Sequence, residues 1–454
     1  MLVLVIPVID VTQVKKDILD NQHLVDGFEL RWDYCQNILD VKFAKIRQLT
    51  TKPLLFTLRK KQQGGLFPES EEKRWLLIQH LAKYLPDYID LEWDVPLAWF
   101  LQLKTDFPKI QLIASYHDFK AHGQHIKTVY QKVSAYPISV FKCACEVNSS
   151  LHALELFVAT SRLIDIPFTF IAMGECGQFL RILGPVFKNA MDYVCINTAL
   201  APGQLSIKET LETYHYRTLN TETQIFALLG FPIDKSLGHI WHNQQILLHG
   251  INAVYVKIKL TEVELDAFLA LAFELPFEGF SITMPLKKTV GQYVLASPHQ
   301  VVNTLKRCEN GWLAHETDGE GASRALNLKK SCRVLVIGDG GAAVSIMHAL
   351  SLLGHQVYCY SRKGGGENNL NAEFDCIINT IPAQAYGSGS RFTQSVLAIL
   401  SVRHTVMDIN YNQQSRFIQK ATEAGATIID GYAMFVEQAI LQFNYWFENN
   451  VQVI

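Results

Sequence analysis

Two side chains in the first half of the sequence have types suited to removing a proton next to a ketone. Lys142 follows the apolar run 138–141, so we expect a partly desolvated amine that can attack a carbonyl. His117, in the sequence Ser115-Tyr116-His117-Asp118, ends the preceding apolar run and is a candidate proton carrier. The alternative is that Lys142 is a surface lysine and His117 a histidine packed in the core.

Short apolar runs alternate with longer amphipathic stretches throughout this half, which is typical of α/β proteins. Most of these runs end in polar or ionisable residues, and in a (β/α)8 barrel such ends meet at the mouth where active sites are built. We therefore predict a closed (β/α)8 TIM barrel with His117 and Lys142 at its mouth. The expected strands are 2–8, 27–30, 54–58, 88–91, 111–114, 139–141, 168–172 and 193–197.

A glycine-rich turn in the second half points to a dinucleotide. The apolar run 333–337 leads directly into this turn, and a helix-like segment, 344–352, follows it. Such a turn lets the backbone approach a pyrophosphate at a helix N-terminus, whereas a simple tight turn is the alternative. The predicted cofactor-binding residues of the turn are Gly338, Gly340, Gly341, Ala342 and Ala343.

The next expected strand, 356–360, ends in Ser361, Arg362 and Lys363. It offers no acidic residue where sites specific for NAD bind the ribose hydroxyls, and a cation there suits a 2′-phosphate. This pattern favours NADP(H) over NAD, although a solvated basic turn would look the same.

Composition excludes several other classes of protein. The 454 residues include 41 basic and 43 acidic side chains, so a net charge of −2 predicts neither a nucleic-acid partner nor a membrane partner. The nine cysteines lack the spacing of a zinc site, so we expect no metal. The apolar start is followed by charged residues and lacks a basic leader, so we expect a cytoplasmic protein.

The first half, residues 1–215, resembles type I 3-dehydroquinate dehydratases in the order and spacing of several motifs. These are Glu29-Leu30-Arg31-Trp32-Asp33, Thr57-Leu58-Arg59 with Gly64-Gly65, Tyr116-His117-Asp118, Phe141-Lys142, Met173-Gly174 with Leu180-Arg181, and Ala201-Pro202-Gly203-Gln204. The resemblance implies a Schiff base between Lys142 and the C3 ketone of 3-dehydroquinate, with His117 moving the protons. It also implies that the substrate is bound by Glu29, Arg31, Arg59, Arg181 and Gln204.

Two positions depart from that family pattern. Gln63 stands where a glutamate usually precedes the paired glycines, and Leu200 stands where a serine usually precedes Ala-Pro-Gly-Gln. The loss of one such contact costs about 1–3 kcal/mol, so we expect a slower or weaker dehydratase that is still active.

The second half resembles shikimate dehydrogenases over residues 225–450. The motifs are Gly230-Phe231-Pro232-Ile233 with Ser236 and His242-Asn243, the segment 279–287, Val302-Asn303-Thr304, Thr317-Asp318-Gly319, Asn379-Thr380, the segment 408–411, and Gly431 with Gln438-Ala439. The resemblance implies that Lys287 and Asp318 are the catalytic pair and that Thr380 and Gly431 contribute to the cofactor site. Substrate hydroxyls and carboxylate would be bound by Ser236, Thr283, Asn303, Tyr411 and Gln438.

Departures occur here as well, because Gly238, His239 and Ser281 replace a serine, a proline and an asparagine of the family pattern. Gly238 leaves room near the expected carboxylate site, so use of quinate as a second substrate is a hypothesis.

Together these patterns predict an enzyme that dehydrates 3-dehydroquinate and then reduces 3-dehydroshikimate to shikimate with NADPH. The expected domains are a barrel at 1–215, a substrate domain at 225–325 completed by 431–450, and a Rossmann-like domain at 330–430. The alternatives are a metabolite-binding regulator on the same folds, a shikimate/quinate dehydrogenase with a weakened dehydratase, and a lysine-dependent aldolase fused to an unrelated reductase.

Overall fold

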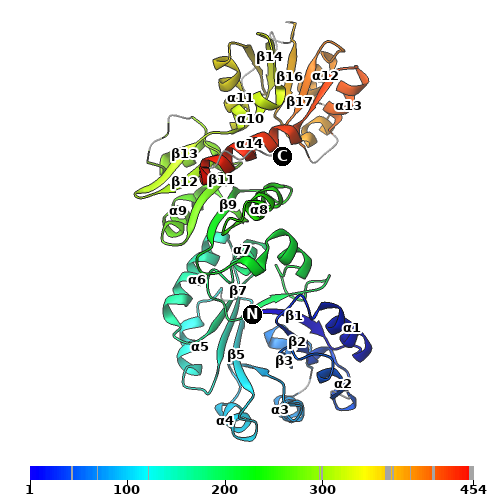
Figure 1. Cartoon of the computed structure of the whole chain (residues 1–454), viewed down its shortest axis with the longest axis vertical. Coiled ribbons are helices and arrows are strands. Elements are labelled where there is room, and N and C mark those ends of the chain that lie inside the picture. Colours follow the sequence, from blue (N-terminus) through cyan, green and yellow to red (C-terminus); the bar gives the residue numbers. More distant parts are fainter. Residues whose placement is uncertain are drawn as a thin grey trace. The chain divides into compact units, whose positions relative to one another are not determined.

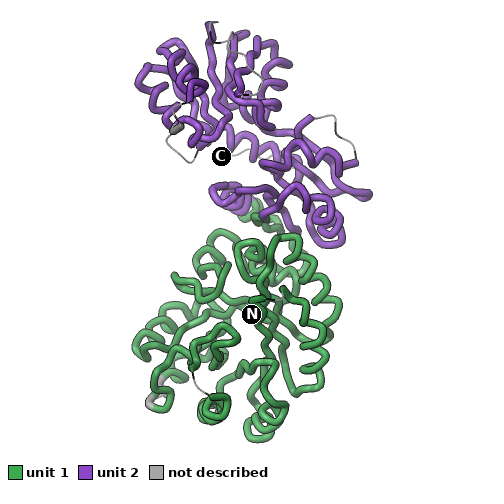
Figure 2. The backbone as a smooth tube through the Cα atoms, turned by 180° about the vertical axis from the view of Figure 1, so that it is seen from behind, with its two compact units in different colours: residues 1–223, 246–258 green, residues 224–245, 259–454 purple. Residues whose placement is uncertain are grey.

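The computed structural model describes residues 1–448 except 42–43, 69, 121, 296, 298–299, 363–369, 371–372, 389 and 412–414. The chain divides into two compact units, one of residues 1–223 with 246–258 and one of residues 224–245 with 259–454 (Figure 2). Within the described ranges, no helix is both long and apolar enough to span a membrane.

The first unit contains a near-closed barrel of eight parallel strands (Figure 1). Strand β1 pairs with both β2 and β8, and pairing continues in order from β2 to β7. The strands are β1 (Leu2–Pro7), β2 (Gly27–Arg31), β3 (Leu54–Thr57), β4 (Tyr88–Glu92), β5 (Gln111–Asp118), β6 (Val140–Glu146), β7 (Phe168–Met173) and β8 (Asp192–Val194). The predicted barrel is confirmed.

Helices follow the barrel strands along the chain (Figure 1). They are α1 (Val11–Asn21), α2 (Ala44–Arg47), α3 (Glu71–Ala82), α4 (Leu97–Asp106), α5 (Ile126–Val133), α6 (Ser150–Leu163) and α7 (Gln178–Ile182). Several begin at a residue whose side chain accepts a backbone N–H of the first turn, such as Asp10 before α1 and Ser149 before α6. Residues 246–258 of this unit carry most of β10 (Ala253–Lys259).

Strands β5 and β6 are longer than their apolar runs suggested. His117 and Lys142 therefore lie within the strands, and the expectation that Lys142 follows its strand is wrong. Side chains alternate between the two faces of a strand, so Lys142 shares a face with Val140 and Ala144, which belong to a buried cluster with Val3 and other strand residues. The strand continues through a buried lysine because carboxylates lie beside its amine, as described below.

The second unit contains two sheets. In the first, β9 (Gln224–Gly230) pairs in parallel with β11 (Phe277–Ile282), β11 pairs antiparallel with β12 (Thr304–Cys308), and β12 pairs antiparallel with β13 (Gly311–His315). The helices along this part of the chain are α8 (Gly238–Leu248), α9 (Leu265–Phe273) and α10 (Asp318–Leu326).

The other sheet is parallel, and its Rossmann-like type is as predicted; its strand order is β15-β14-β16-β17-β18. Its strands are β14 (Arg333–Ile337), β15 (Gln356–Tyr360), β16 (Cys376–Asn379), β17 (Thr405–Asp408) and β18 (Thr427–Asp430). The helices that accompany it are α11 (Gly341–Leu352), α12 (Arg391–Ala398), α13 (Arg416–Glu423) and α14 (Gly431–Phe447).

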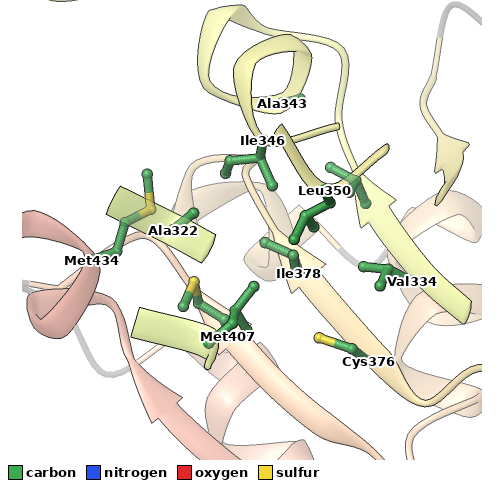
Figure 3. Packing of buried hydrophobic residues seen from close by; sticks show 11 residues of the cluster. Ala322, Val334, Ala343, Ile346, Leu350, Cys376, Ile378, Met407 and Met434 are labelled. Atoms are coloured by element: carbon green, nitrogen blue, oxygen red, sulfur yellow. The ribbon is translucent and has the colours of Figure 1, made fainter. Parts of the chain in front are cut away.

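Alternate residues of β14 enter two different cores because the sheet is covered on both faces. Val334 and Val336 pack in one cluster with Ala322 of α10, Ile346 of α11 and Met434 of α14, which also includes residues of β16 and β17 (Figure 3). Leu335 and Ile337 pack in a second cluster with residues of α12 and α13. Helix α10 is thereby attached to the Rossmann-like sheet while its first residue, Asp318, remains beside the other sheet.

Two glycines let α10 approach its neighbouring helices closely. A Cβ on Gly319 would lie 2.5 Å from the carbonyl oxygen of Ser345 and 2.8 Å from the Cβ of Ala349, both on α11. A Cβ on Gly321 would lie 2.8 Å from the backbone nitrogen of Gln438 on α14. Separations below 3 Å require the helices to move apart, so this packing depends on glycine at both positions.

We expect Gly319→Ala to lower the free energy of unfolding by about 1–3 kcal/mol, because the added methyl group meets backbone that cannot rotate away. Chemical denaturation of the second unit would measure this loss. Gly291→Ala is the matched control, since no described heavy atom lies within 4 Å of the added Cβ. Equal stability of the two variants would contradict the packing argument.

Candidate active sites

A cavity of about 70 Å³ in the first unit is lined by every residue that the sequence assigned to the dehydration. These residues come from different strands and loops of the barrel. They are Glu29, Arg31, Arg59, His117, Lys142, Arg181 and Gln204.

The Lys142 amine is surrounded by two carboxylates and an aromatic ring. Its Nζ lies 3.2 Å from Asp90 Oδ2 and 3.5 Å from Glu29 Oε1. The ring of Tyr193 faces the amine with its centroid 4.0 Å away, within the range of a cation–π interaction. Only 5% of Lys142 is exposed, so the amine is held in one place and largely shielded from water.

A second buried cation lies next to this amine. Arg59 Nη2 lies 2.7 Å from Asp90 Oδ2, and its Nη1 donates a hydrogen bond of 2.6 Å to Ser115 Oγ. Burial alone would raise the pKa of Asp90, but the charges of Arg59 and Lys142 hold it below its usual range. Asp90 therefore stays ionised and compensates two buried cations at once.

His117 is neutral in this environment. Burial lowers the pKa of His117 well below 6.5, and the positive charges of Arg59 and Lys142 lower it further. Its Nδ1 has no hydrogen-bond partner in the part of the chain that the structure describes. Gln63, one of the departures from the family pattern, accepts a hydrogen bond of 2.9 Å from the His117 backbone N–H.

The other side of the cavity carries Arg181. Burial lowers its pKa to about 10, and Arg181 Nη2 donates a hydrogen bond of 3.0 Å to the carbonyl oxygen of Pro202. Its Nε has no partner among the residues described, so a buried donor is available to an anion. Gln204 accepts a hydrogen bond of 2.9 Å from the backbone N–H of Leu200, whose side chain lines the cavity without a polar group.

In the second unit, Lys287 of η8 (Leu286–Lys288) forms an ion pair with Asp318 Oδ2. The other carboxylate oxygen, Asp318 Oδ1, accepts a hydrogen bond of 2.8 Å from Asn303 Nδ2. Asn303 also donates to Thr317 Oγ1 and accepts from the Thr317 backbone N–H. The three predicted residues Lys287, Asp318 and Asn303 are therefore brought together and held in a fixed arrangement.

The glycine turn lies directly against this group. A Cβ on Gly341 would lie 3.2 Å from both Cβ and Cδ of Lys287. Gly338 has a φ of +115°, and a Cβ there would lie 2.4 Å from Thr380 Oγ1. Gly340 has no side chain to cap α11, so the first N–H groups of that helix are open to a phosphate. The residues of this turn therefore fit the pyrophosphate of a dinucleotide, and the turn lies next to Lys287.

The remaining residues predicted for the cofactor surround the same sheet edge. Ala343 is buried in the core behind the turn, and Ala342 lies beside it in the first turn of α11. Ser361 is buried and follows β15, while the Arg362 guanidinium lies 5.9 Å from the ring centroid of Phe392. Lys363 lies outside the described residues. Gly431 begins α14, where a Cβ would lie 2.1 Å from the carbonyl oxygen of Asp408.

The remaining residues predicted for the substrate make contacts within the second unit. Ser236 and Tyr411 are hydrogen-bonded to each other, and the ring of Tyr411 lies 4.9 Å from that of Phe435 on α14. Thr283 follows β11, and its carbonyl oxygen accepts the backbone N–H of Leu286 at the start of η8. The Nε2 of Gln438 donates to the carbonyl oxygen of Phe435.

Comparison with known proteins agrees with both halves of this geometry. A family model of type I 3-dehydroquinase matches residues 2–221, and a model of the shikimate dehydrogenase substrate binding domain matches residues 228–305. The chain is 31% identical over 465 residues to the shikimate biosynthesis protein AroDE of Chlamydia pneumoniae, covering 96% of this chain and 93% of that protein. The chain belongs to the AroDE-like family of bifunctional type I 3-dehydroquinase/shikimate dehydrogenases.

This bifunctional enzyme has 3-dehydroquinate dehydratase and shikimate dehydrogenase activities in the shikimate pathway, as predicted, and the alternatives of a regulator or an aldolase are set aside. It is also 25% identical to the chloroplastic bifunctional 3-dehydroquinate dehydratase/shikimate dehydrogenase of Arabidopsis thaliana, covering 92% of this chain and 77% of that one. A shikimate dehydrogenase from Thermus thermophilus, solved with NADP(H) and shikimate, covers 50% of this chain and 94% of that chain, with 23% identity and a TM-score of 0.45.

Sequence reasoning missed three residues of the bifunctional enzyme's two sites. Asp90 and Tyr193 surround the Lys142 amine, and Glu316 accepts hydrogen bonds from the backbone at Asp318. Asp90 and Glu92 stand two positions apart in the run 88–92, so they share one face of the strand. Two carboxylates on the inward face of a buried strand are a signal that would have located Asp90. Tyr193 and Glu316 carry no comparable signal.

Proposed function

We propose that Lys142 is the nucleophile and His117 the proton carrier of the dehydratase. The observation that supports this most is a shielded amine in the same cavity as a histidine whose pKa is held well below 6.5. A neutral imidazole can accept a proton at neutral pH without first losing one. Placement in one cavity is also what the two residues need in order to act on a single small substrate.

The reaction then follows from the residues in order. The Lys142 amine adds to the C3 ketone of 3-dehydroquinate, and water leaves to form an iminium. His117 removes the C2 proton, and the electron pair moves into the ring and towards the iminium nitrogen. The C1 hydroxyl departs as water after accepting a proton from His117, and hydrolysis of the iminium releases 3-dehydroshikimate and free Lys142. The net change is the loss of one water molecule.

The cations around the cavity suit the anionic substrate. Arg181 has an unpaired buried donor for a carboxylate, and Arg31 and Arg59 add positive charge beside it. Glu29 and Gln204 are proposed to accept and donate hydrogen bonds with the ring hydroxyls. The buried Asp90 keeps Arg59 and Lys142 in position while no substrate is bound.

Borohydride reduction tests the covalent step. Incubation of the purified chain with 3-dehydroquinate and borohydride is expected to add the mass of the bound ketone less one oxygen atom, which leaves as water when the imine forms, to one peptide, the one that contains Lys142. Reversible binding without an adduct would contradict the Schiff base. Addition of NADPH instead of borohydride should yield shikimate from the same mixture, which tests both halves of the bifunctional enzyme together.

For the dehydrogenase, we propose that Lys287, polarised by Asp318, gives a proton to the C3 oxygen of 3-dehydroshikimate. A nicotinamide cofactor, when bound, would supply the hydride that C3 of the substrate accepts. The net reaction takes up one proton and converts NADPH to NADP⁺. Asn303 fixes the Asp318 carboxylate, and the substrate hydroxyls and carboxylate are proposed to be bound by Ser236, Thr283, Asn303, Tyr411 and Gln438.

We propose NADP(H) as the cofactor, bound by Gly338, Gly340, Gly341, Ala342, Ala343, Ser361, Arg362, Lys363, Thr380 and Gly431. The open N-terminus of α11 supports the pyrophosphate site, and the guanidinium of Arg362 supports the 2′-phosphate site. Arg362→Ser is expected to raise the KM for NADPH by about 10- to 100-fold, because a charge-assisted hydrogen bond is lost.

The KM for NADH should stay the same in Arg362→Ser, since NADH carries no 2′-phosphate. Initial rates with each cofactor measure the difference, and Arg416→Ser, exposed on α13, is the control. Parallel increases for both cofactors would contradict a role of Arg362 in phosphate recognition.

The domain limits 1–215, 225–325 with 431–450, and 330–430 remain predictions, as does the cytoplasmic location. Limited proteolysis at the predicted joint would test the first boundary, because a joint between folded domains is cut before their interiors.

A further inference from the structure

The ionisable side chain of Glu316 is hydrogen-bonded to the backbone of Asp318. Its Oε1 accepts a hydrogen bond of 2.7 Å from the Asp318 N–H, and its Oε2 accepts one of 3.1 Å from the Gly319 N–H. Thr317, the residue before α10, uses its hydroxyl to accept from Asn303 and does not cap the helix within the described chain. The carboxylate of Glu316 therefore takes the place of the missing cap.

This arrangement determines where the Asp318 carboxylate points. Its two oxygens are engaged separately, one by Asn303 and the other by Lys287, so a small shift of the Asp318 backbone would break one of these contacts. The hydrogen bonds to Glu316 are made by the backbone of Asp318 itself and of the following residue. They oppose such a shift most strongly when both carboxylate oxygens of Glu316 accept.

The charge of Glu316 changes near neutral pH. Burial raises the pKa of Glu316 to about 7, and the negative charge of Asp318 raises it, whereas the hydrogen bonds from the two N–H groups and the charge of Lys287 lower it. The charged groups that act on Glu316 are thus Asp318 at the start of α10 and Lys287 of η8. Above this pH Glu316 accepts both hydrogen bonds and adds a negative charge beside the pair; below it, one oxygen carries a proton and the charge is gone.

We propose that Glu316 is a positioning residue that makes the dehydrogenase sensitive to pH by holding Asp318 in place for Lys287. The proposal rests on the proposed roles of Lys287 and Asp318 in proton transfer. During oxidation of shikimate the pair receives the proton of the C3 hydroxyl, so a firmly held Asp318 with an additional negative charge nearby favours the step. The kcat for shikimate oxidation therefore rises as Glu316 ionises.

The test is the pH profile of shikimate oxidation with saturating NADP⁺ for the full chain and for Glu316→Gln. The wild type is expected to show an inflection of kcat near pH 7. In Glu316→Gln this inflection should disappear, and the ratio of kcat above pH 7 to kcat below it should fall by about threefold or more. The KM values for shikimate and NADP⁺ should remain those of the wild type, because Glu316 is not proposed to bind either.

Glu320→Gln is the matched control, since Glu320 lies on α10, is exposed and pairs with Arg324. It should keep the wild-type profile. An inflection that persists unchanged in Glu316→Gln would overturn the proposal. A loss of kcat by the same factor at every pH, together with higher KM values, would also overturn it, because this is the result expected if Glu316 only caps the helix. If Glu316→Gln does not fold, Glu316→Asp serves instead: the inflection should remain with a shifted midpoint, and its loss in that variant would overturn the proposal.

Asp318→Asn separates this inference from the proposed function. That variant should lose shikimate oxidation at every pH. If Asp318→Asn stayed fully active, the assignment of the catalytic pair would fail and the role of Glu316 with it. If Asp318→Asn is inactive while Glu316→Gln keeps the inflection, only the inference about Glu316 fails.

Discussion

Lys142→Met is expected to lower the rate of 3-dehydroquinate dehydration by about four orders of magnitude or more, because no covalent iminium can form. Methionine has nearly the length and volume of lysine, so the buried site keeps its packing but loses the amine. Asp90 retains its ion pair with Arg59, and Glu29 retains its hydrogen bond from Thr57, so neither carboxylate is left without a partner. Dehydration is followed through the absorbance of the conjugated enone product.

The dehydrogenase activity of the same preparation is the control. Reduction of 3-dehydroshikimate with NADPH by Lys142→Met should proceed at the wild-type rate, since that reaction does not use Lys142. Lys127→Ala, on the exposed side of α5, should leave both reactions unchanged. Substantial remaining dehydration by Lys142→Met would rule out the Schiff base and require another route for removing the C2 proton.

Asp318→Asn is expected to lower the kcat of shikimate oxidation by about 10²- to 10⁴-fold. The amide has the same size as the carboxylate but removes the counter-ion of Lys287. Its NH2 group must replace one of the two carboxylate oxygens and therefore faces either Asn303 or Lys287. Both neighbours are donors, so the arrangement that holds the pair is lost. Formation of NADPH at saturating shikimate and NADP⁺ measures the effect.

The dehydratase rate of Asp318→Asn should equal that of the wild type, which shows that the first unit is folded and that the protein concentration is correct. Asp266→Asn, exposed on α9, is the matched substitution in the same unit. A variant whose KM for shikimate rises while kcat is unchanged would assign Asp318 to substrate binding instead of proton transfer.

The departures from the family pattern have different structural consequences. Gln63 still contacts the strand that carries His117, but through the His117 backbone N–H, and the buried Nδ1 is left without an acceptor among the described residues. Leu200 contributes only an apolar surface to the cavity. Both observations fit the expectation that the dehydratase is weaker than one with the full set of polar contacts, while the amine and the imidazole are retained.

The barrel and the Rossmann-like sheet follow from the sequence. Each of the eight expected runs overlaps a barrel strand, because a strand buried on both faces consists mostly of apolar residues. The glycines between an apolar run and a helix-like segment also predicted the turn between β14 and α11. Glycine is needed at Gly338 because its φ is +115°. Residues such as Lys142 and Lys287 stood out because their motifs resemble those of two enzyme families.

Tertiary structure alone decided which groups surround these residues. Lys142 lies within β6 because Asp90 and Glu29, from two other strands, compensate its charge. The apolar run in β6 does not indicate which residues these partners are. Likewise, Glu316 belongs to the dehydrogenase site only because α10 begins where its carboxylate meets two backbone N–H groups. Local sequence determines periodicity, turns and chemical type, since these depend on neighbours in the chain. Burial, charge and hydrogen bonding of a side chain depend on residues far away along the chain, and only the folded structure brings those residues together.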